Sequence, residues 1–409
     1  MRLVTAAALC LLATVPASAQ SPASAQAPAS AQADVDPQVR LIHEQMLVLD
    51  THLDTPARFD SGEWDFTDLH HYGWDLSQTD LPRMDLGGLD GGFFVIYTAQ
   101  GELTPEGYAS ARDRALVRAA AIRRVIGENR DRMGLALTAD DAERLHSEGR
   151  KIAFMSIENS WPLGEDLSLL DTFHKLGVRM AGPVHSRSNQ LADSTTGEAR
   201  WNGLSPLGRQ WVAEMNRLGM VIDGSHSSDA AIDQMMELSR VPIVLSHHGP
   251  RDLYDHPRNT SDERMRRLAS KGGVMFMNTL FLGTTDGSDE RSEIERRQQM
   301  WHSLTAQERR QLVADKAALD ARQPATTITF DMFMRSLLHA VEVMGVDHVG
   351  LGADWDGGGG VVGMDDVSLL PRITARLLRE GMSEEDIAKI MGGNLLRVLR
   401  QVQAGAARS

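Results

Sequence analysis

Two residues near the start of the sequence, His52 and Asp54, could hold one metal ion together. They follow the apolar run Met46–Leu49 in the stretch VLDTHLDTPAR, and this run predicts a short buried strand. Side chains alternate along an extended chain, so residues two positions apart point the same way. Imidazole and carboxylate are both good ligands of divalent metals. A structural role is the alternative for this pair alone, with His52 capping a strand and Asp54 holding a turn.

Apolar runs like this one recur along the chain. Each is followed by a helical pattern or a long charged insert, which is typical of a parallel α/β sheet. Eight such units predict a (β/α)8 TIM barrel of the metal-dependent hydrolase type, with a doubly wound open sheet as the alternative. The eight predicted strands are Met46–Leu49, Gly92–Thr98, Ile152–Ile157, Val178–Val184, Met220–Asp223, Pro242–Ser246, Gly273–Asn278 and His348–Ala353.

Six of the eight runs have His, Asp or Glu at or just past their carboxyl end, and only the second and seventh runs do not. In a barrel these ends converge on one face, where the chemistry takes place. Each residue alone has a structural explanation, such as a helix cap or a turn. Their common position favours a shared site instead. The residues are His52 and Asp54, Glu158, His185, His226, His247 and Asp354.

The residue types favour zinc or another divalent first-row metal, because His and carboxylate occur without Cys. More candidate ligands are present than one tetrahedral site takes, so we expect two ions per chain. The ions of two-metal hydrolases lie about 3.5–4 Å apart and share a carboxylate, and Glu158 is the only Glu in the set. A water that bridges such ions becomes hydroxide near neutral pH, which is a nucleophile that needs neither Ser nor Cys.

Length, composition and charge limit the classes of protein further. The chain has 409 residues, of which 42% are hydrophobic, so it can bury a large core. Its formal net charge of -14 is spread over interleaved acidic and basic residues, which argues against nucleic acid as a partner. Small molecules and peptides remain compatible with this charge.

Residues 1–19 predict a secretory signal peptide, with Arg2, an apolar segment and an Ala17-Ser18-Ala19 ending. Its apolar segment is too short to span a bilayer, and no later run is long enough to be a transmembrane helix. We therefore expect a protein exported to the periplasm or secreted. The only cysteine, Cys10, lies in this segment, so the mature chain can form no disulfide.

The rest of the chain predicts one spacer and one domain. Residues 20–36 are rich in Ala, Ser, Gln and Pro, with almost nothing to bury, and predict a disordered spacer. Residues 37–409 predict a single (β/α)8 catalytic domain. A highly charged, periodic stretch around residues 282–327 predicts a helical insertion after the seventh strand.

Seven longer motifs follow one another through this domain: LDTHLDTP, SIENS, GVRMAGPVHSRSNQLADS, GLSPLGRQWVAEMNRLGMVIDGSHSS, VPIVLSHHGPRDLYDHPRNTSDE, VGLGADWDG and IMGGNLLRVL. Together they resemble the membrane dipeptidase, or renal dipeptidase, family of zinc peptidases. The resemblance spans nearly the whole domain in the right order. It implies a (β/α)8 barrel with a binuclear zinc site, in agreement with the strand pattern, and it also implies a homodimer.

Carried over position by position, the resemblance implies roles for the metal ligands. His52 and Asp54 would bind the first zinc ion, and His226 and His247 the second. Glu158 would bridge the two ions together with a water or hydroxide.

The resemblance also implies roles in substrate binding and catalysis. His185 would face the substrate carbonyl and its oxyanion. Arg258, in HPRNTSDE, would hold the substrate's terminal carboxylate, a task that suits a planar guanidinium with two parallel hydrogen bonds. Asp354 would move the proton from the attacking water to the leaving amine. Alternation along the strand turns His248 away from its neighbour, so we do not include it in the site.

These residues predict a binuclear zinc metallopeptidase that hydrolyses dipeptides with a free C-terminal carboxylate by means of a metal-bridging hydroxide. One alternative is a related metal-dependent amidase or lactonase. Another is a noncatalytic periplasmic binding protein, which would have no use for Asp354 as a proton shuttle. Bulky residues stand where the family usually has smaller ones, at Asn159 to Trp161 and at Trp355, so the substrate's side chains are not carried over.

Overall fold

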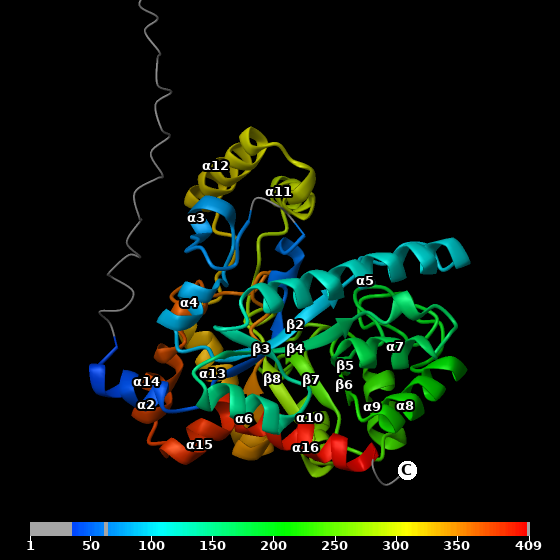
Figure 1. Ribbon diagram of the computed structural model, residues 1–409. Helices are drawn as coiled ribbons and strands as arrows, with labels where there is room; N and C mark the ends of the chain where they lie inside the picture. Colours follow the sequence, from blue (N-terminus) through cyan, green and yellow to red (C-terminus); the bar gives the residue numbers. More distant parts are fainter. Residues whose placement is uncertain (1–34, 61–63, 407–409) are drawn as a thin grey trace, which may run out of the picture.

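The computed structural model describes residues 35–60 and 64–406 (Figure 1). The predicted signal peptide and residues 20–34 of the predicted spacer lie outside these residues. The first described helix, α2 (Pro37–Glu44), begins at Asp36, whose side chain accepts a hydrogen bond from Gln38 N at 2.8 Å. Across the described part of the chain, no helix combines the length and the apolar character needed to cross a membrane.

Eight parallel strands form a barrel at the centre of the described molecule, with helices around it (Figure 1). They are β1 (Leu49–Leu53), β2 (Gly91–Tyr97), β4 (Lys151–Glu158), β5 (Val178–Ala181), β6 (Val221–Ile222), β7 (Val244–His248), β8 (Val274–Met277) and β9 (Val349–Leu351). The ladder runs β1-β2-β4-β5-β6 and then β7-β8-β9. Parallel bridges from Asp223 to Val244 and from Leu53 to Trp355 join these two sheets at both sides. The predicted (β/α)8 barrel is confirmed.

Helices connect the strands and cover the barrel. Most begin at a Ser or Thr whose side chain accepts a hydrogen bond from a backbone N–H in the first turn, for example Thr104 before α5 and Ser228 before α9. The covering helices are α5 (Pro105–Glu128), α6 (Ala139–Ser147), α7 (Leu169–Leu176), α8 (Pro206–Leu218), α9 (Asp229–Leu238), α10 (Asp262–Ser270), α13 (Phe330–Met344), α14 (Pro371–Arg379), α15 (Glu384–Ala388) and α16 (Asn394–Ala406).

Alternation along the strands separates two apolar layers. Phe93, Phe154 and Phe276 belong to an inner cluster, to which α16 adds Leu395 and Leu399. The intervening strand residues pack in the larger cluster beneath the covering helices. The inner cluster is apolar. The functional polar side chains of such a barrel lie at the carboxyl ends of the strands.

The first strand lies further along the chain than predicted. It starts at Leu49 rather than Met46 and continues through polar residues to Leu53. These residues stay in the strand because the barrel pairs their polar groups. The Thr51 hydroxyl donates to Ser246 O at 2.6 Å, and the Asp50 carboxylate accepts from Ala353 N at 3.0 Å. His52 is therefore inside the strand and not after it.

Other strand boundaries also differ from the prediction. β7 continues to His248, so His247 lies inside this strand and not after it. The fifth strand of the chain, β5, ends at Ala181, before Pro183, which has no N–H for a ladder bond. A short strand that was not predicted, β3 (Met133–Leu135), pairs in parallel with the start of β4.

Residues 282–327 contain two helices, α11 (Asp289–Gln299) and α12 (Ala306–Arg322), which lie beside the short helix α3 (Tyr72–Asp75) at the top of Figure 1. A small apolar cluster of their own includes Ile294, Leu312 and Leu319. The guanidinium of Arg58 lies over the rings of both Trp64 and Trp301, at 5.9 and 5.7 Å. The segment thus contacts the turn η1 (Thr55–Arg58), which directly follows Asp54.

Candidate metal and substrate site

The predicted side chains at the strand ends meet at the carboxyl end of the barrel, around Glu158. Its Oε1 lies 3.0 Å from His226 Nε2 and 3.6 Å from His247 Nε2. Oε2 of the same carboxylate lies 3.7 Å from His52 Nε2. One carboxylate therefore has an imidazole beside each oxygen, which is the arrangement expected of a group that two metal ions share.

A second group of side chains surrounds His52. Its Nε2 lies 3.4 Å from Asp54 Oδ2 and 3.9 Å from Asp354 Oδ1. Any side chain added at Gly357 would collide with both of these carboxylates, so the loop after β9 must pass closely over them. The ligand atoms of these residues form three overlapping groups, which are His52, Glu158 and His247; Glu158, His185 and His226; and His52, Asp54 and Asp354.

Buried nitrogen atoms test whether these residues suit a metal ion. Both ring nitrogens of His52 and Nδ1 of His226 are buried, and none of them has a hydrogen-bond partner among the described residues. A buried polar atom without a partner is costly, and coordination of a cation would satisfy Nε2 of His52. The donors are imidazole nitrogen and carboxylate oxygen, the set that divalent zinc takes in hydrolases. The residues fit the predicted metal.

The tautomer of His247 follows from its neighbours. The Ser246 hydroxyl donates to Asp223 Oδ2 at 2.6 Å, because a carboxylate can only accept. Ser246 Oγ lies 2.9 Å from His247 Nδ1 and must accept there. Nδ1 of His247 therefore carries the proton, and the lone pair is on Nε2, which faces Glu158. This is how proteins commonly orient an imidazole that binds a metal.

Burial and charge separate the two carboxyl groups that the sequence analysis singled out. Burial opposes ionisation of Glu158, but His52, His185 and a hydrogen bond from His226 hold its pKa well below the usual value. Burial raises the pKa of Asp354 to about 7, and only part of this shift is offset by His52. Glu158 is therefore ionised near neutral pH, whereas Asp354 can exchange a proton there.

The backbone at the site adopts a conformation that few residues other than glycine take. Both His226 and Asp354 have φ of 66°, in the left-handed region, in the loops that follow β6 and β9. Such conformations cost free energy and persist where the surrounding structure enforces them, commonly at functional sites.

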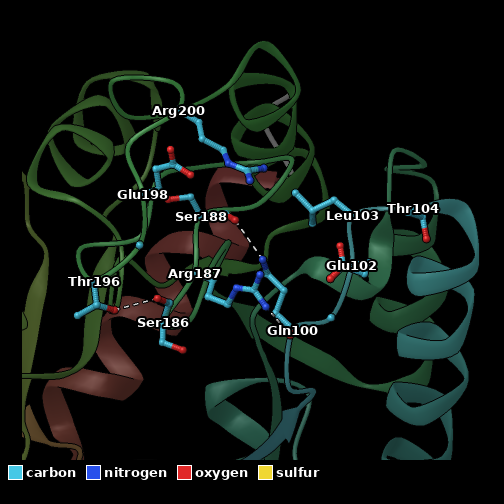
Figure 2. Close-up of a pocket in the computed structure, with 12 residues that line it drawn as sticks. Gln100, Glu102, Leu103, Thr104, Ser186, Arg187, Ser188, Thr196, Glu198 and Arg200 are labelled. Carbon is cyan, nitrogen blue, oxygen red and sulfur yellow. Dashed lines mark hydrogen bonds between the residues drawn. The ribbon is translucent and has the colours of Figure 1, made fainter.

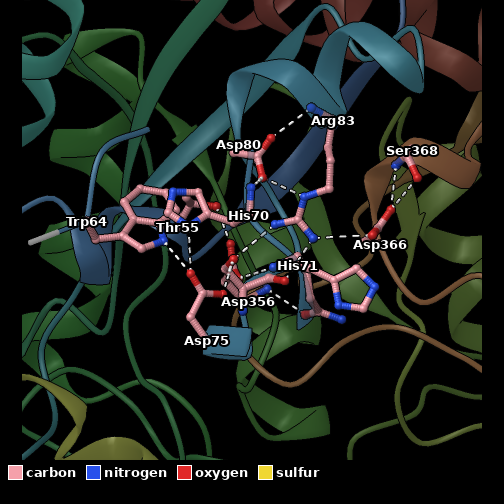
Figure 3. A network of polar contacts seen from close by, with 12 residues as sticks. Thr55, Trp64, His70, His71, Asp75, Asp80, Arg83, Asp356, Asp366 and Ser368 are labelled. Carbon is pink, nitrogen blue, oxygen red and sulfur yellow. Dashed lines mark hydrogen bonds and ion pairs between the residues drawn. The ribbon is translucent and has the colours of Figure 1, made fainter. Parts of the chain in front are cut away.

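A polar network holds the loop after Asp354 in place (Figure 3). Asp356 accepts from the Thr55 hydroxyl at 2.6 Å and from Gln78 N at 2.7 Å, so it ties the loop after β9 to the turn after β1. Arg83, in α4 (Leu81–Leu86), donates hydrogen bonds to Asp80 and Asp366, as Figure 3 shows. It also donates to Ser77 O. The carboxylates of Asp54 and Asp354 thus sit on loops that are fixed to each other.

Arg258 lies in the segment after β7, and 3% of it is exposed. None of its guanidinium nitrogens has a hydrogen-bond partner among the described residues, and the group lies 5.4 Å from the centre of the Phe281 ring. Burial lowers its pKa to about 10, and the carboxylates of Asp354 and Glu158 counteract part of this shift. Arg258 remains a cation at neutral pH, with three nitrogens available to an anion.

His185 is the most exposed of the predicted imidazoles, and its Nε2 lies 3.9 Å from Glu158 Oε1. Burial lowers the pKa of His185. The negative charge of Glu158 counteracts part of this shift, and the positive charge of Arg258 adds to it, so the pKa stays below the usual value. It is therefore neutral near pH 7. His248, which the sequence analysis left out, is buried and belongs to none of the three donor groups.

Tyr97 is a site residue that the sequence analysis did not identify. It ends β2 exactly opposite Glu158 in the register of β4, and its ring centre lies 4.9 Å from that of His185. Burial raises the pKa of Tyr97, and the negative charges of Glu158 and Asp54 raise it further, so the phenol stays neutral. Tyr97 shares one face of β2 with Phe93 and Val95, so the alternation of side chains could have indicated that it faces the barrel interior. Its residue type did not, because tyrosine is not a usual metal ligand.

The fold and this set of side chains define a metal-dependent hydrolase of the barrel type, and comparison with known proteins gives the family. A model described as membrane dipeptidase (peptidase family M19) matches residues 37–409. Dipeptidase tcpJ from Claviceps purpurea is 33% identical over 339 residues, or 80% of this chain and 70% of that protein. The chain belongs to the membrane dipeptidase family.

Solved structures of similar proteins agree with this assignment. The probable dipeptidase PvdM from Pseudomonas aeruginosa has a TM-score of 0.78 at 29% identity, over 93% of this chain and 100% of that chain. A metallopeptidase from Rhodobacter sphaeroides, liganded with a phosphinate mimic of the dipeptide L-Ala-D-Ala, has a TM-score of 0.70 at 25% identity. That match covers 87% of this chain and 99% of the other.

Proposed function

We propose that this protein is a binuclear zinc dipeptidase that hydrolyses dipeptides with a free C-terminal carboxylate. The observation that carries the proposal is Arg258, a buried cation without a hydrogen-bond partner among the described residues, near the carboxylates of the candidate metal site. A buried cation of this kind calls for an anionic partner, and a substrate carboxylate can supply it. The family match and the relative that binds a dipeptide mimic support the same substrate class.

In this proposal, five side chains hold two zinc ions. His52 and Asp54 would hold one ion and His226 and His247 the other, and both ions would share the carboxylate of Glu158. When bound, such ions lower the pKa of a coordinated water and polarise the scissile carbonyl. The low pKa of Glu158 suits a bridging ligand, which must be ionised.

The remaining residues position the substrate and move protons. Asp354 accepts a proton from the attacking water and returns it to the leaving amine, and a pKa of about 7 suits a group that does both. His185 lies beside the substrate carbonyl and stabilises the charge that develops on its oxygen. Arg258 holds the C-terminal carboxylate at a fixed distance from the reacting bond, so an interior peptide bond, which lacks that carboxylate, is not cleaved.

A panel of substrates tests the proposal. Purified protein is assayed with L,L and L,D dipeptides, an N-acetylated dipeptide and a C-amidated dipeptide, each with and without a chelator. We expect hydrolysis of free-carboxylate dipeptides that chelation abolishes and zinc restores. Equal hydrolysis of the amidated dipeptide would point to a broader metal-dependent amidase, and no hydrolysis of any substrate would leave a binding protein. Export and a homodimer stay predictions.

A further inference from the structure

The strand that ends at Tyr97 and the strand that precedes Arg258 lie on opposite sides of the barrel. In the order of the barrel strands, β2 and β7 are separated by three strands in one direction and three in the other. Tyr97 ends β2, and Arg258 follows β7. Glu158 ends β4, the strand next to β2, and is the register partner of Tyr97.

This placement suggests the direction in which a dipeptide binds. With its carboxylate at Arg258 and its scissile carbonyl near Glu158, its N-terminal residue extends toward Tyr97. The tyrosine is 37% exposed, although the other residues of β2 are buried, so its ring is open to a ligand. Its contact with the His185 ring fixes the ring on one side.

A cavity of about 370 Å³, whose lining is drawn in Figure 2, is formed by residues that are close to these two in the chain. Its lining comes from residues 100–104, shortly after Tyr97, from residues 186–188, directly after His185, and from a third segment within residues 196–200. The lining is mostly polar, with Gln100, Glu102, Ser186, Arg187, Glu198 and Arg200. Gln100 Nε2 donates to Ser188 O at 3.0 Å, which holds the two segments together. The volume is enough for a long side chain.

We propose that Tyr97 and this cavity form the subsite for the side chain of the dipeptide's N-terminal residue. The inference rests on the proposed dipeptidase function, because the orientation of the substrate comes from Arg258. The ring of Tyr97 forms the wall of the subsite next to the reacting bond. The polar groups beyond it favour N-terminal residues with long polar side chains over glycine.

Tyr97→Ala tests the wall of the subsite. For the wild type we expect a higher kcat/KM for Gln-Ala than for Gly-Ala, and the variant should reduce this ratio about tenfold. The ratio for Ala-Gln over Ala-Gly should stay unchanged, because the C-terminal residue lies at the other side. Tyr97→Phe, which keeps the ring, should restore the Gln-Ala preference. A general loss of folded enzyme would leave both ratios unaltered.

Arg187→Glu tests the cavity without risk to folding, because Arg187 is exposed. Reversal of this charge should raise kcat/KM for Lys-Ala relative to Glu-Ala about tenfold. The same change at Arg130, an exposed residue in the loop before β3, should not. Wild-type turnover with unchanged ratios in both Tyr97→Ala and Arg187→Glu would overturn the subsite alone. Failure of the wild type to cleave any of these dipeptides would overturn the proposed function, and the subsite with it.

Discussion

Ser246 Oγ lies 2.9 Å from Nδ1 of its neighbour His247, and this contact leaves the lone pair of the imidazole on Nε2, toward Glu158. In Ser246→Ala the imidazole loses the partner that fixes its tautomer and its orientation. We expect zinc affinity at this site to fall about 10- to 100-fold, the usual effect of losing such a partner. Competition with a fluorescent chelator measures it. Ser270→Ala, which removes an exposed hydroxyl from α10, is the control, and equal affinities in the two variants would contradict the assignment.

Glu158→Gln should weaken both metal sites together. An amide keeps the shape of the carboxylate but loses the charge that two cations would share. Elemental analysis should find about two zinc ions per wild-type chain and fewer than one in the variant. His52→Ala should empty mainly one site and keep the other. Two ions and normal turnover in Glu158→Gln would show that this carboxylate is not the bridge.

Asp354→Asn should separate proton transfer from metal binding. Asn keeps the size of the side chain but cannot accept a proton, and general acid-base groups contribute roughly 10²- to 10⁴-fold to rate. We expect a loss of this size in kcat, with the metal content retained. A kcat within about threefold of the wild type would exclude Asp354 as the proton carrier.

The contacts of His70 lead us to predict that the stability of the fold depends on pH. Its Nδ1 lies 2.6 Å from Asp75 Oδ2 and its Nε2 lies 2.8 Å from Asp65 O (Figure 3). Both oxygen partners only accept hydrogen bonds, so the ring is doubly protonated. Burial opposes this charge, but the contacts with Asp75 and Asp65 raise the pKa of His70 overall. A raised pKa stabilises the fold below the unfolded value of about 6.5, and the effect is lost as pH rises through the folded value.

His70→Gln should therefore lower the free energy of unfolding most at pH 6 and least at pH 9. The difference at pH 6 should be on the order of 1 kcal/mol, as for a hydrogen bond to a charged group. Asp75 stays ionised at pH 6, because despite its burial the hydrogen bond from His70 and the charge of Arg58 hold its pKa below the usual value. Denaturant unfolding at both pH values measures this. A difference that does not change with pH would rule out the charged pair.

Much of the barrel could be predicted because each strand is an apolar run buried on both faces, and this pattern is local in the sequence. β1 was misplaced because Asp50 and Thr51 are polar, and their partners in other strands are visible only in three dimensions. β3 was missed because three residues, Met133–Leu135, carry too little pattern.

The His, Asp and Glu residues of the candidate site followed from residue type and strand position, whereas Arg258 came only from the family resemblance. Tyr97 was missed because a tyrosine at the end of an apolar strand has the same pattern as a core residue. The tautomer of His247 depends on Asp223, 23 residues before Ser246, and no spacing in the sequence reveals such a contact. The structure therefore adds contacts, such as those of Ser246 with His247 and of Tyr97 with His185, that the sequence does not reveal.

The most direct test of the account compares a free dipeptide with its C-amidated analogue in the wild type and in Arg258→Ala. We expect the wild type to prefer the free carboxylate by about 100-fold in kcat/KM, which corresponds to roughly 2.7 kcal/mol. In Arg258→Ala this preference should shrink to less than about tenfold, because no buried cation remains to hold the carboxylate. Incomplete folding would slow both substrates equally and leave their ratio intact. A wild type that cleaves both substrates alike, or a variant that keeps the full preference, would contradict the assignment of Arg258 and the dipeptidase proposal built on it.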